Sequence, residues 1–178
     1  MIIIISGLHG TGKSTVGNIL AKKLNLKYYS TGQAFRELAK EKVMSLKEFN
    51  KFVEEHSEID KTLDNKVLQK AQQEDNIVID SQIGGYLLKD LADHKILLKC
   101  PLEIRVKRMV ERDDSLYHEK LEETKVREQS EMDRFKDLYD IDLSDENKQQ
   151  ELYDIIIDTS NLSIEEVVEK ILSKINLK

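Results

Sequence analysis

The sequence contains very little cysteine, proline or aromatic residue, and it has no long apolar run. Its 178 residues include one cysteine, one proline and no tryptophan, and aromatic residues make up 6% of the chain. A single cysteine, Cys100, excludes an internal disulfide. No apolar stretch approaches the roughly 20 residues that cross a bilayer, and the apolar residues 1–6 are too few for a secretory signal. We therefore expect a cytoplasmic protein with no membrane role.

Excess positive charge is also absent. The chain has 28 basic and 34 acidic residues, which give a net charge of -6. A protein that binds nucleic acid through its surface needs a basic track or stacking aromatic side chains. We therefore expect no nucleic-acid partner, and any anionic ligand must be met by local positive charge.

The most informative motif follows the first apolar run. Residues 7–14 read G-L-H-G-T-G-K-S and match the phosphate-binding loop G-x-x-x-x-G-K-[ST]. In this motif backbone N–H groups surround a polyphosphate, Lys13 reaches the β- and γ-phosphates of ATP, and the Ser14 hydroxyl binds Mg²⁺. The alternative, a glycine-rich turn without a ligand, is disfavoured because a strand precedes the motif and a helix follows it. The predicted loop residues that hold ATP are Gly7, Leu8, His9, Gly10, Thr11, Gly12, Lys13, Ser14 and Thr15.

Alternating apolar patterns predict the fold. Five strand candidates, residues 2–5, 28–29, 77–80, 95–99 and 153–158, are separated by helical segments. This order is typical of an α/β protein with a five-stranded parallel sheet and helices on both faces, whose ligand lies beyond the carboxyl ends of the strands. We expect one domain over residues 1–178, with a helical insertion over 31–76 and a polar loop before the last strand. Asp80 ends an apolar strand, where it either binds Mg²⁺ through water or caps the next turn.

Arginine is rare and clustered. Of six arginines, five lie between residues 105 and 134 on two predicted helices. The planar guanidinium holds phosphate oxygens in a fixed geometry better than lysine does. We therefore predict a mobile cationic lid over residues 105–135. The alternative is a pair of exposed helices whose arginines form salt bridges with nearby glutamates.

Several segments resemble the nucleoside monophosphate kinases, and among these the archaeal-type cytidylate kinases. They are residues 7–14, 30–36, 101–105 and 127–136. The resemblance implies a phosphate-loop kinase core, a monophosphate-binding insertion over 31–76 and a lid that closes over both nucleotides. It further implies that the chain transfers the γ-phosphoryl group of ATP to CMP and dCMP.

The resemblance also implies roles for individual residues. Thr31 and Arg36 would hold the acceptor monophosphate, and Arg127, Glu131 and Arg134 would surround the acceptor and the transferred phosphate. Arg105 and Arg108 would contact nucleotide phosphates or stack on the donor base, and Thr159 and Ser160 would border the donor adenine. Gln82 stands where relatives commonly have an arginine that grips the acceptor, and Gln33 stands where they often have an acid. The residues expected to act on the transferred phosphate are Lys13, Arg105, Arg127 and Arg134.

Any alternative function must also account for the phosphate-binding loop. Adenylate kinases, other monophosphate kinases and shikimate-type kinases share the core. A regulatory GTPase would need N-K-x-D to read guanine, whereas Asn147 and Lys148 are followed by two glutamines. Phosphoryl transfer to a phosphate oxygen needs no covalent nucleophile, so catalysis would consist mainly of alignment and cation placement. We expect a monomer in which Lys13 faces solvent before ATP binds.

Overall fold

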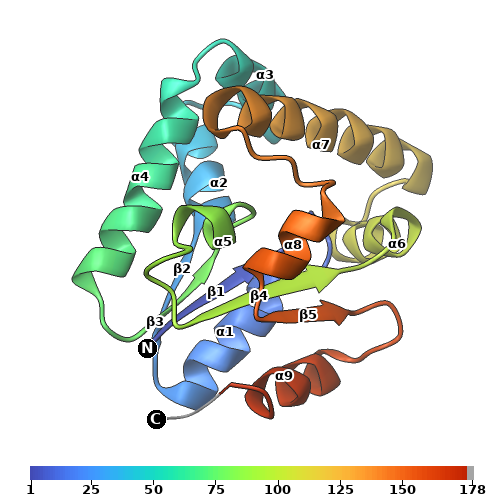
Figure 1. Ribbon diagram of the computed structural model, residues 1–178. Coiled ribbons are helices and arrows are strands. Elements are labelled where there is room, and N and C mark those ends of the chain that lie inside the picture. The colour runs from blue at the N-terminus through green and yellow to red at the C-terminus, as the bar shows by residue number, and fades with distance from the viewer. Residues whose placement is uncertain (176–178) are drawn as a thin grey trace.

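A parallel sheet of five strands forms the centre of the molecule (Figure 1). The computed structural model describes residues 1–175. The strand order is β2-β3-β1-β4-β5, and every neighbouring pair is parallel. The strands are β1 (Ile2–Ser6), β2 (Lys27–Ser30), β3 (Ile77–Asp80), β4 (His94–Lys99) and β5 (Ile155–Asp158). The predicted α/β fold is confirmed.

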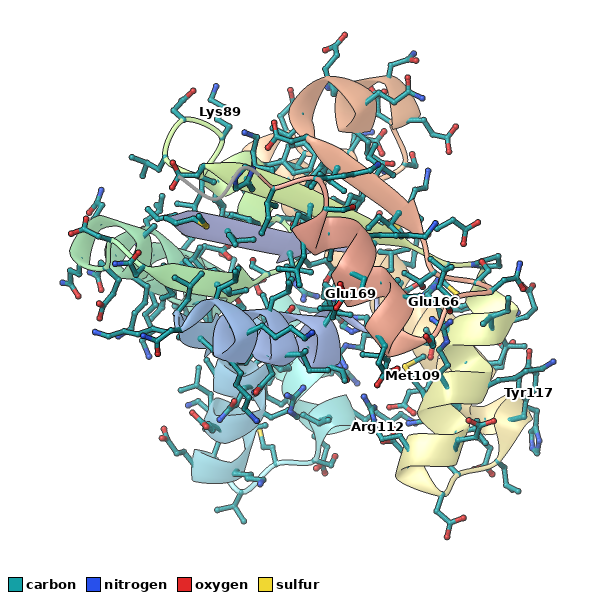
Figure 2. The ribbon with its side chains drawn as sticks, turned by 90° about the horizontal axis from the view of Figure 1, so that it is seen from below. Lys89, Met109, Arg112, Tyr117, Glu166 and Glu169 are labelled. Carbon is teal, nitrogen blue, oxygen red and sulfur yellow. The ribbon has the colours of Figure 1, made fainter. Side chains whose placement is uncertain are left out.

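Alternate residues of β1 point to opposite faces of the sheet, and both faces are covered. Ile3 and Ile5 pack toward α1 (Lys13–Leu24) and α9 (Ile164–Leu172), whereas Ile4 packs toward α4 (Glu58–Gln73). All three isoleucines are fully buried, which explains why this strand reads as a continuous apolar run. Figure 2 shows α1 and α9 on the same side of the sheet, where Lys23 Nζ lies 3.0 Å from Glu169 Oε1.

The insertion is helical, as predicted. It comprises α2 (Thr31–Glu41), α3 (Leu46–Glu54) and α4, which share a small apolar core around Phe35, Phe49 and Leu63. A capping box joins Ser45 and Glu48 at the start of α3. Because this cluster is separate from the two that cover the sheet, the insertion has its own packing centre.

The arginines lie on α6 (Leu102–Asp113) and α7 (Tyr117–Tyr139), which form the predicted hairpin. Asp114 turns the chain between them in a left-handed conformation, with φ 49°. In Figure 1, α7 crosses from the side of α6 to α3 above the carboxyl ends of the strands. This long helix therefore connects the lid to the insertion.

Three details differ from the sequence-based expectation. The short helices α5 (Gly84–Leu87) and α8 (Glu146–Leu152) were not predicted, and β5 begins at Ile155 rather than at residue 153. The residues of α8 leave no apolar period because none of them is buried. Tyr153 still belongs to the end of α8, since its N–H donates to Gln149 O at 3.0 Å. Within residues 1–175, no helix combines the length and apolar character that crossing a membrane requires.

Candidate active site

The phosphate-binding loop connects β1 to α1 and depends on its glycines. Gly10 and Gly12 have φ values of 78° and 97°, which side chains rarely adopt. A Cβ on Gly10 would also lie 2.7 Å from Arg105 O, so α6 approaches the loop backbone directly. Within the loop, Thr11 Oγ1 donates to Leu8 O at 2.8 Å. The loop is therefore held by internal hydrogen bonds and by contact with α6.

Lys13 is directed into the loop rather than into solvent. It is half-buried, and its Nζ donates to Leu8 O at 3.0 Å. Burial lowers the pKa of its ammonium group, and the carboxylates of Asp80, Glu131 and Glu128 oppose that shift. The prediction that Lys13 faces solvent is thus wrong. Its position inside the loop is nevertheless the position from which a lysine reaches phosphate oxygens.

The two predicted magnesium ligands lie side by side. Ser14 Oγ donates to Asp80 Oδ2 at 2.6 Å, and Asp80 is buried at the end of β3. The same carboxylate oxygen accepts hydrogen bonds of 3.1 Å from Tyr28 OH and from Ser30 Oγ. Burial and the charge of Asp80 raise the pKa of Tyr28 to about 12.

These donors suit Mg²⁺ because it is a hard cation that takes few protein oxygens and retains several waters. No group of three or more His, Cys, Asp or Glu side chains that could hold a metal occurs in residues 1–175. Ser14 and Asp80 would therefore hold the ion together with water and nucleotide oxygens.

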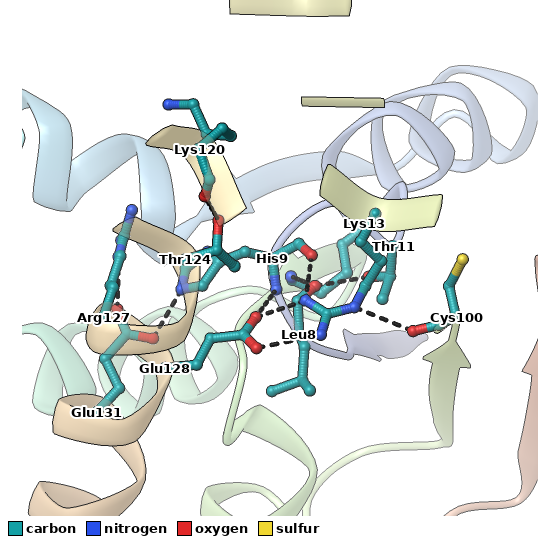
Figure 3. Close-up of polar contacts among 11 residues, drawn as sticks. Leu8, His9, Thr11, Lys13, Cys100, Lys120, Thr124, Arg127, Glu128 and Glu131 are labelled. Carbon is teal, nitrogen blue, oxygen red and sulfur yellow. Dashed lines mark hydrogen bonds and ion pairs between the residues drawn. The ribbon is translucent and has the colours of Figure 1, made fainter. Parts of the chain in front are cut away.

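A buried ion pair lies against the loop at His9 (Figure 3). Arg105 Nη1 and Nη2 donate to the two oxygens of Glu128 at 2.5 and 3.1 Å. Arg105 Nη1 also donates to His9 O at 2.7 Å, and the His9 N–H donates to Glu128 Oε1 at 3.2 Å. Arg105 Nε completes the set by donating to Cys100 O at 3.0 Å. Arg105 is therefore committed to protein partners.

Glu131 connects the loop to the next arginine of α7. Its Oε2 accepts from His9 Nε2 at 2.7 Å, and its Oε1 accepts from Arg127 Nε at 2.8 Å. Burial raises the pKa of Glu131, but the charges and hydrogen bonds of His9 and Arg127 outweigh burial and hold that pKa well below its ordinary value. The carboxylate is thus ionised and places Arg127 close to the loop.

Arg134 pairs with the insertion. Its Nε donates to Asp60 Oδ2 of α4 at 2.8 Å, and its Nη1 donates to Ser130 Oγ at 2.6 Å. One turn further along α4, Asp64 Oδ2 accepts from Tyr139 OH at 2.7 Å. Burial raises the pKa of both aspartates, that of Asp64 to about 6. Asp60 and Asp64 therefore bring two buried carboxyl groups against α7.

The other residues predicted to bind the acceptor lie on α2 and in the segment after β3. Thr31 is the first residue of α2, and its Oγ1 is buried with no hydrogen-bond partner among residues 1–175. Arg36 is exposed one turn later on the same helix. Gln82 lines a cavity of about 190 Å³ beside Gly7 and Tyr86, where its Nε2 is also buried without a partner.

The residues predicted to border the donor adenine lie in the loop after β5. Arg108 Nη1 and Nη2 donate to Thr159 Oγ1 and O at 3.0 and 2.6 Å, and Thr159 Oγ1 donates to Thr11 O at 3.3 Å. Ser160 N–H donates to Asp158 Oδ1 at 2.8 Å. Thr159 and Ser160 thus lie beside the phosphate-binding loop. Arg112, exposed at the far end of α6, pairs with Asp113 (Figure 2).

The expected cationic surface on the lid is instead a set of paired charges. Arg105, Arg127 and Arg134 each bind a carboxylate. A guanidinium that is removed from water needs such a partner, because an unpaired buried charge is costly. The expectation of a free cationic face is therefore corrected. The salt bridges that the alternative interpretation of these two helices predicted are present.

Sequence reasoning missed the partners of these arginines. Glu128, Asp60 and Asp64 are buried charged residues within predicted helices. The resemblance to the monophosphate kinases singled out Glu131, but it assigned no role to Glu128, which lies one turn before it on α7. Tyr28 and Ser30 were also missed, although both precede the predicted helix at Thr31.

The fold and the site together define a class of protein. A parallel sheet with a phosphate-binding loop after its central strand, a lysine inside that loop and a Ser–Asp oxygen pair beside it are the features of a phosphate-loop kinase. The family described as AAA domain matches residues 3–154. A shikimate kinase structure from Bacteroides thetaiotaomicron is similar, with a TM-score of 0.64 and 14% identity over 97% of each chain. At that identity the likeness concerns the fold alone.

Relatives narrow the class to one family. The chain is 46% identical to the cytidylate kinase of Sulfurisphaera tokodaii, over 99% of this chain and 96% of that one. It is 40% identical to the cytidylate kinase of Sulfolobus acidocaldarius, over 100% and 96% of the two chains. The chain belongs to the cytidylate kinase family, and the resemblance seen in its sequence is confirmed.

Proposed function

We propose that this chain transfers the γ-phosphoryl group of ATP to CMP or dCMP, producing ADP and CDP or dCDP. The observation that carries the proposal is the Ser14–Asp80 oxygen pair beside Lys13, in a chain that shares 46% identity with a cytidylate kinase over nearly its whole length. The oxygen pair would bind Mg²⁺, and the names of the relatives indicate CMP as the acceptor.

The donor phosphates would bind in the loop. Backbone N–H groups of the loop and the start of α1 favour an anion, and Lys13 would exchange its bond to Leu8 O for one to a phosphate oxygen. Mg²⁺ held by Ser14 and Asp80 would neutralise charge on the β- and γ-phosphates. Thr159 and Arg108 would border the adenine, because both lie beside the loop at the end of β5.

The acceptor phosphate would bind near the start of α2. Thr31 offers a hydroxyl without a partner, and Arg36 offers an exposed guanidinium that forms no ion pair among residues 1–175. Arg127 and Arg134 of α7 would contact the acceptor and the transferred phosphate. An acceptor phosphate oxygen is already an anion, so the residues need only align it and stabilise the dispersed charge of the transition state.

A panel of acceptors tests the proposal. ADP formation from ATP and Mg²⁺ should be rapid with CMP and dCMP and slow with AMP, GMP or shikimate. Cytosine and uracil differ in the polarity of two ring-edge groups, so UMP should be used about ten- to a hundredfold less efficiently in kcat/KM. A reaction without acceptor measures wasteful ATP hydrolysis. AMP as the best acceptor would contradict the proposal and leave only the wider class of monophosphate kinases.

A further inference from the structure

The backbone of His9 in the phosphate-binding loop is held on both sides of its Cα by a buried ion pair. The carbonyl of His9 accepts from Arg105 and its N–H donates to Glu128, while Arg105 and Glu128 bind each other through two hydrogen bonds. Their side chains are 4% and 7% exposed. In Figure 3, Glu128 and His9 lie next to each other, with α7 directly against the loop. We call Arg105, Glu128 and the backbone of His9 the loop clamp.

The loop clamp joins four parts of the chain. Arg105 belongs to α6 and binds Cys100 O after β4, Glu128 belongs to α7, and His9 belongs to the loop. Gly10 touches the backbone of Arg105 as well, so α6 meets the loop through both its backbone and a side chain. The orientation of the His9 backbone therefore depends on where α6 and α7 lie.

A buried ion pair is a weak source of net stability. Withdrawing both charges from water costs about as much as their attraction returns, and a matched apolar pair is often equally stable. The geometry indicates what the charged pair supplies instead. Only a pair with both a donor and an acceptor can hold the C=O and the N–H of one residue at the same time, and apolar side chains can hold neither.

We propose that Glu128 is a positioning residue for the donor phosphates. Together with Arg105 it fixes the two peptide groups that flank the Cα of His9, so that the N–H groups of the following loop residues point toward the phosphates. The role of Arg105 is revised in the same way, from contacting phosphates to orienting the loop that binds them. The inference rests on the proposed function only in that the loop binds ATP.

The test is binding of ADP with Mg²⁺, measured by calorimetry without an acceptor, in four variants. Glu128→Ala and the double variant Arg105→Leu/Glu128→Leu should each weaken ADP binding about tenfold or more, since charge-assisted hydrogen bonds that orient the loop are lost. Glu128→Gln should stay within about threefold of the wild type, because its amide oxygen can still accept from His9 and Arg105. Glu122→Ala is the matched control, because Glu122 is an exposed carboxylate of α7 paired with Lys125.

The double variant keeps the test decisive if Glu128→Ala fails to fold. Glu128→Ala leaves a buried guanidinium unpaired and can unfold the chain, whereas the double variant removes both charges. Wild-type ADP affinity in the folded double variant would overturn the proposal, even if its unfolding temperature changed. In steady-state assays the variants should raise the KM for ATP about tenfold and that for CMP less than about twofold. Because ADP binding needs no acceptor, its result is independent of which monophosphate the enzyme uses.

Discussion

At the residue scale, the candidate site depends on a few side chains that neighbouring groups hold in place by hydrogen bonds. Lys13 is held inside the loop by one hydrogen bond to Leu8 O. Asp80 accepts from three hydroxyl groups at a single oxygen, so its other oxygen carries less of the hydrogen bonding. Both residues are arranged before any phosphate arrives, and this arrangement reduces the reorganisation that catalysis would require.

Lys13→Ala should reduce phosphoryl transfer about a hundredfold or more, because the only cation inside the loop is lost while charge develops on the transferred group. The unfolding temperature should change little, since burial already disfavours the charged amine and its single hydrogen bond is to the loop itself. Turnover by coupled ADP assay and thermal unfolding would be measured on the same preparation. A folded variant with near-normal turnover would remove Lys13 from the active site.

At the element scale, the contact between α4 and α7 contains more acid than base. Asp60 has Arg134 as its partner, whereas Asp64 has only the hydroxyl of Tyr139. Burial raises the pKa of Asp64 to about 6, so its ionised form weakens the contact near neutral pH. The helices are thus packed with a charge that costs stability, at the junction between insertion and lid.

Asp64→Asn should relieve that cost, because the amide oxygen can still accept from Tyr139. The pKa of Asp64 in the folded chain lies above its unfolded value of 3.8. The stability that its protonated carboxyl group contributes is therefore fully present below pH 3.8 and is lost as the pH rises through about 6. The variant should match the wild type at about pH 4 and exceed it by about 1 to 3 kcal/mol above about pH 7.

Urea unfolding of both proteins across this range measures the difference, and all other titrating groups cancel in the comparison. A constant difference between the two stabilities at every pH would show that Asp64 does not titrate in this interval. Asp133→Asn, at a residue whose carboxylate accepts from Gln129 on the exposed face of α7, is the control.

At the scale of the whole molecule, the arginines around the acceptor come from parts that pack separately. Arg36 is on the insertion, which has its own apolar core, and Arg134 reaches that insertion from α7 through Asp60. The helix α7 also carries Glu128 and Glu131, which bind the loop. One helix therefore contacts both the phosphate-binding loop and the insertion, and a movement of α7 would change both contacts.

Arg36→Ala and Arg134→Ala should separate binding from catalysis. Arg36 is exposed and unpaired among the described residues, so its loss should raise the KM for CMP about tenfold with little change in kcat. We propose that Arg134 exchanges Asp60 for phosphate as the predicted lid closes, so its loss should mainly lower kcat. Initial rates over a grid of ATP and CMP concentrations give these constants. If both variants changed only the KM for ATP, the two residues would belong to the donor side.

Much of this architecture follows from local sequence. The apolar strands, the glycine loop and the paired arginine helices are short-range patterns, and each is confirmed. Their order along the chain also limits the fold to a parallel sheet with crossover helices. The short helices α5 and α8 were not predicted, because a few residues without an apolar period do not produce a recognisable helical pattern.

The sequence by itself determined where the phosphate-binding loop lies, since the motif is contiguous and its lysine and serine are neighbouring residues at the start of α1. Only the tertiary structure decided their partners. The meeting of Ser14 with Asp80, of Arg105 with Glu128, and of Arg134 with Asp60 joins residues 66, 23 and 74 positions apart. Such pairing depends on how helices pack across the sheet and on the need of each buried charge for a counter-charge, and both are properties of the folded chain rather than of any local segment.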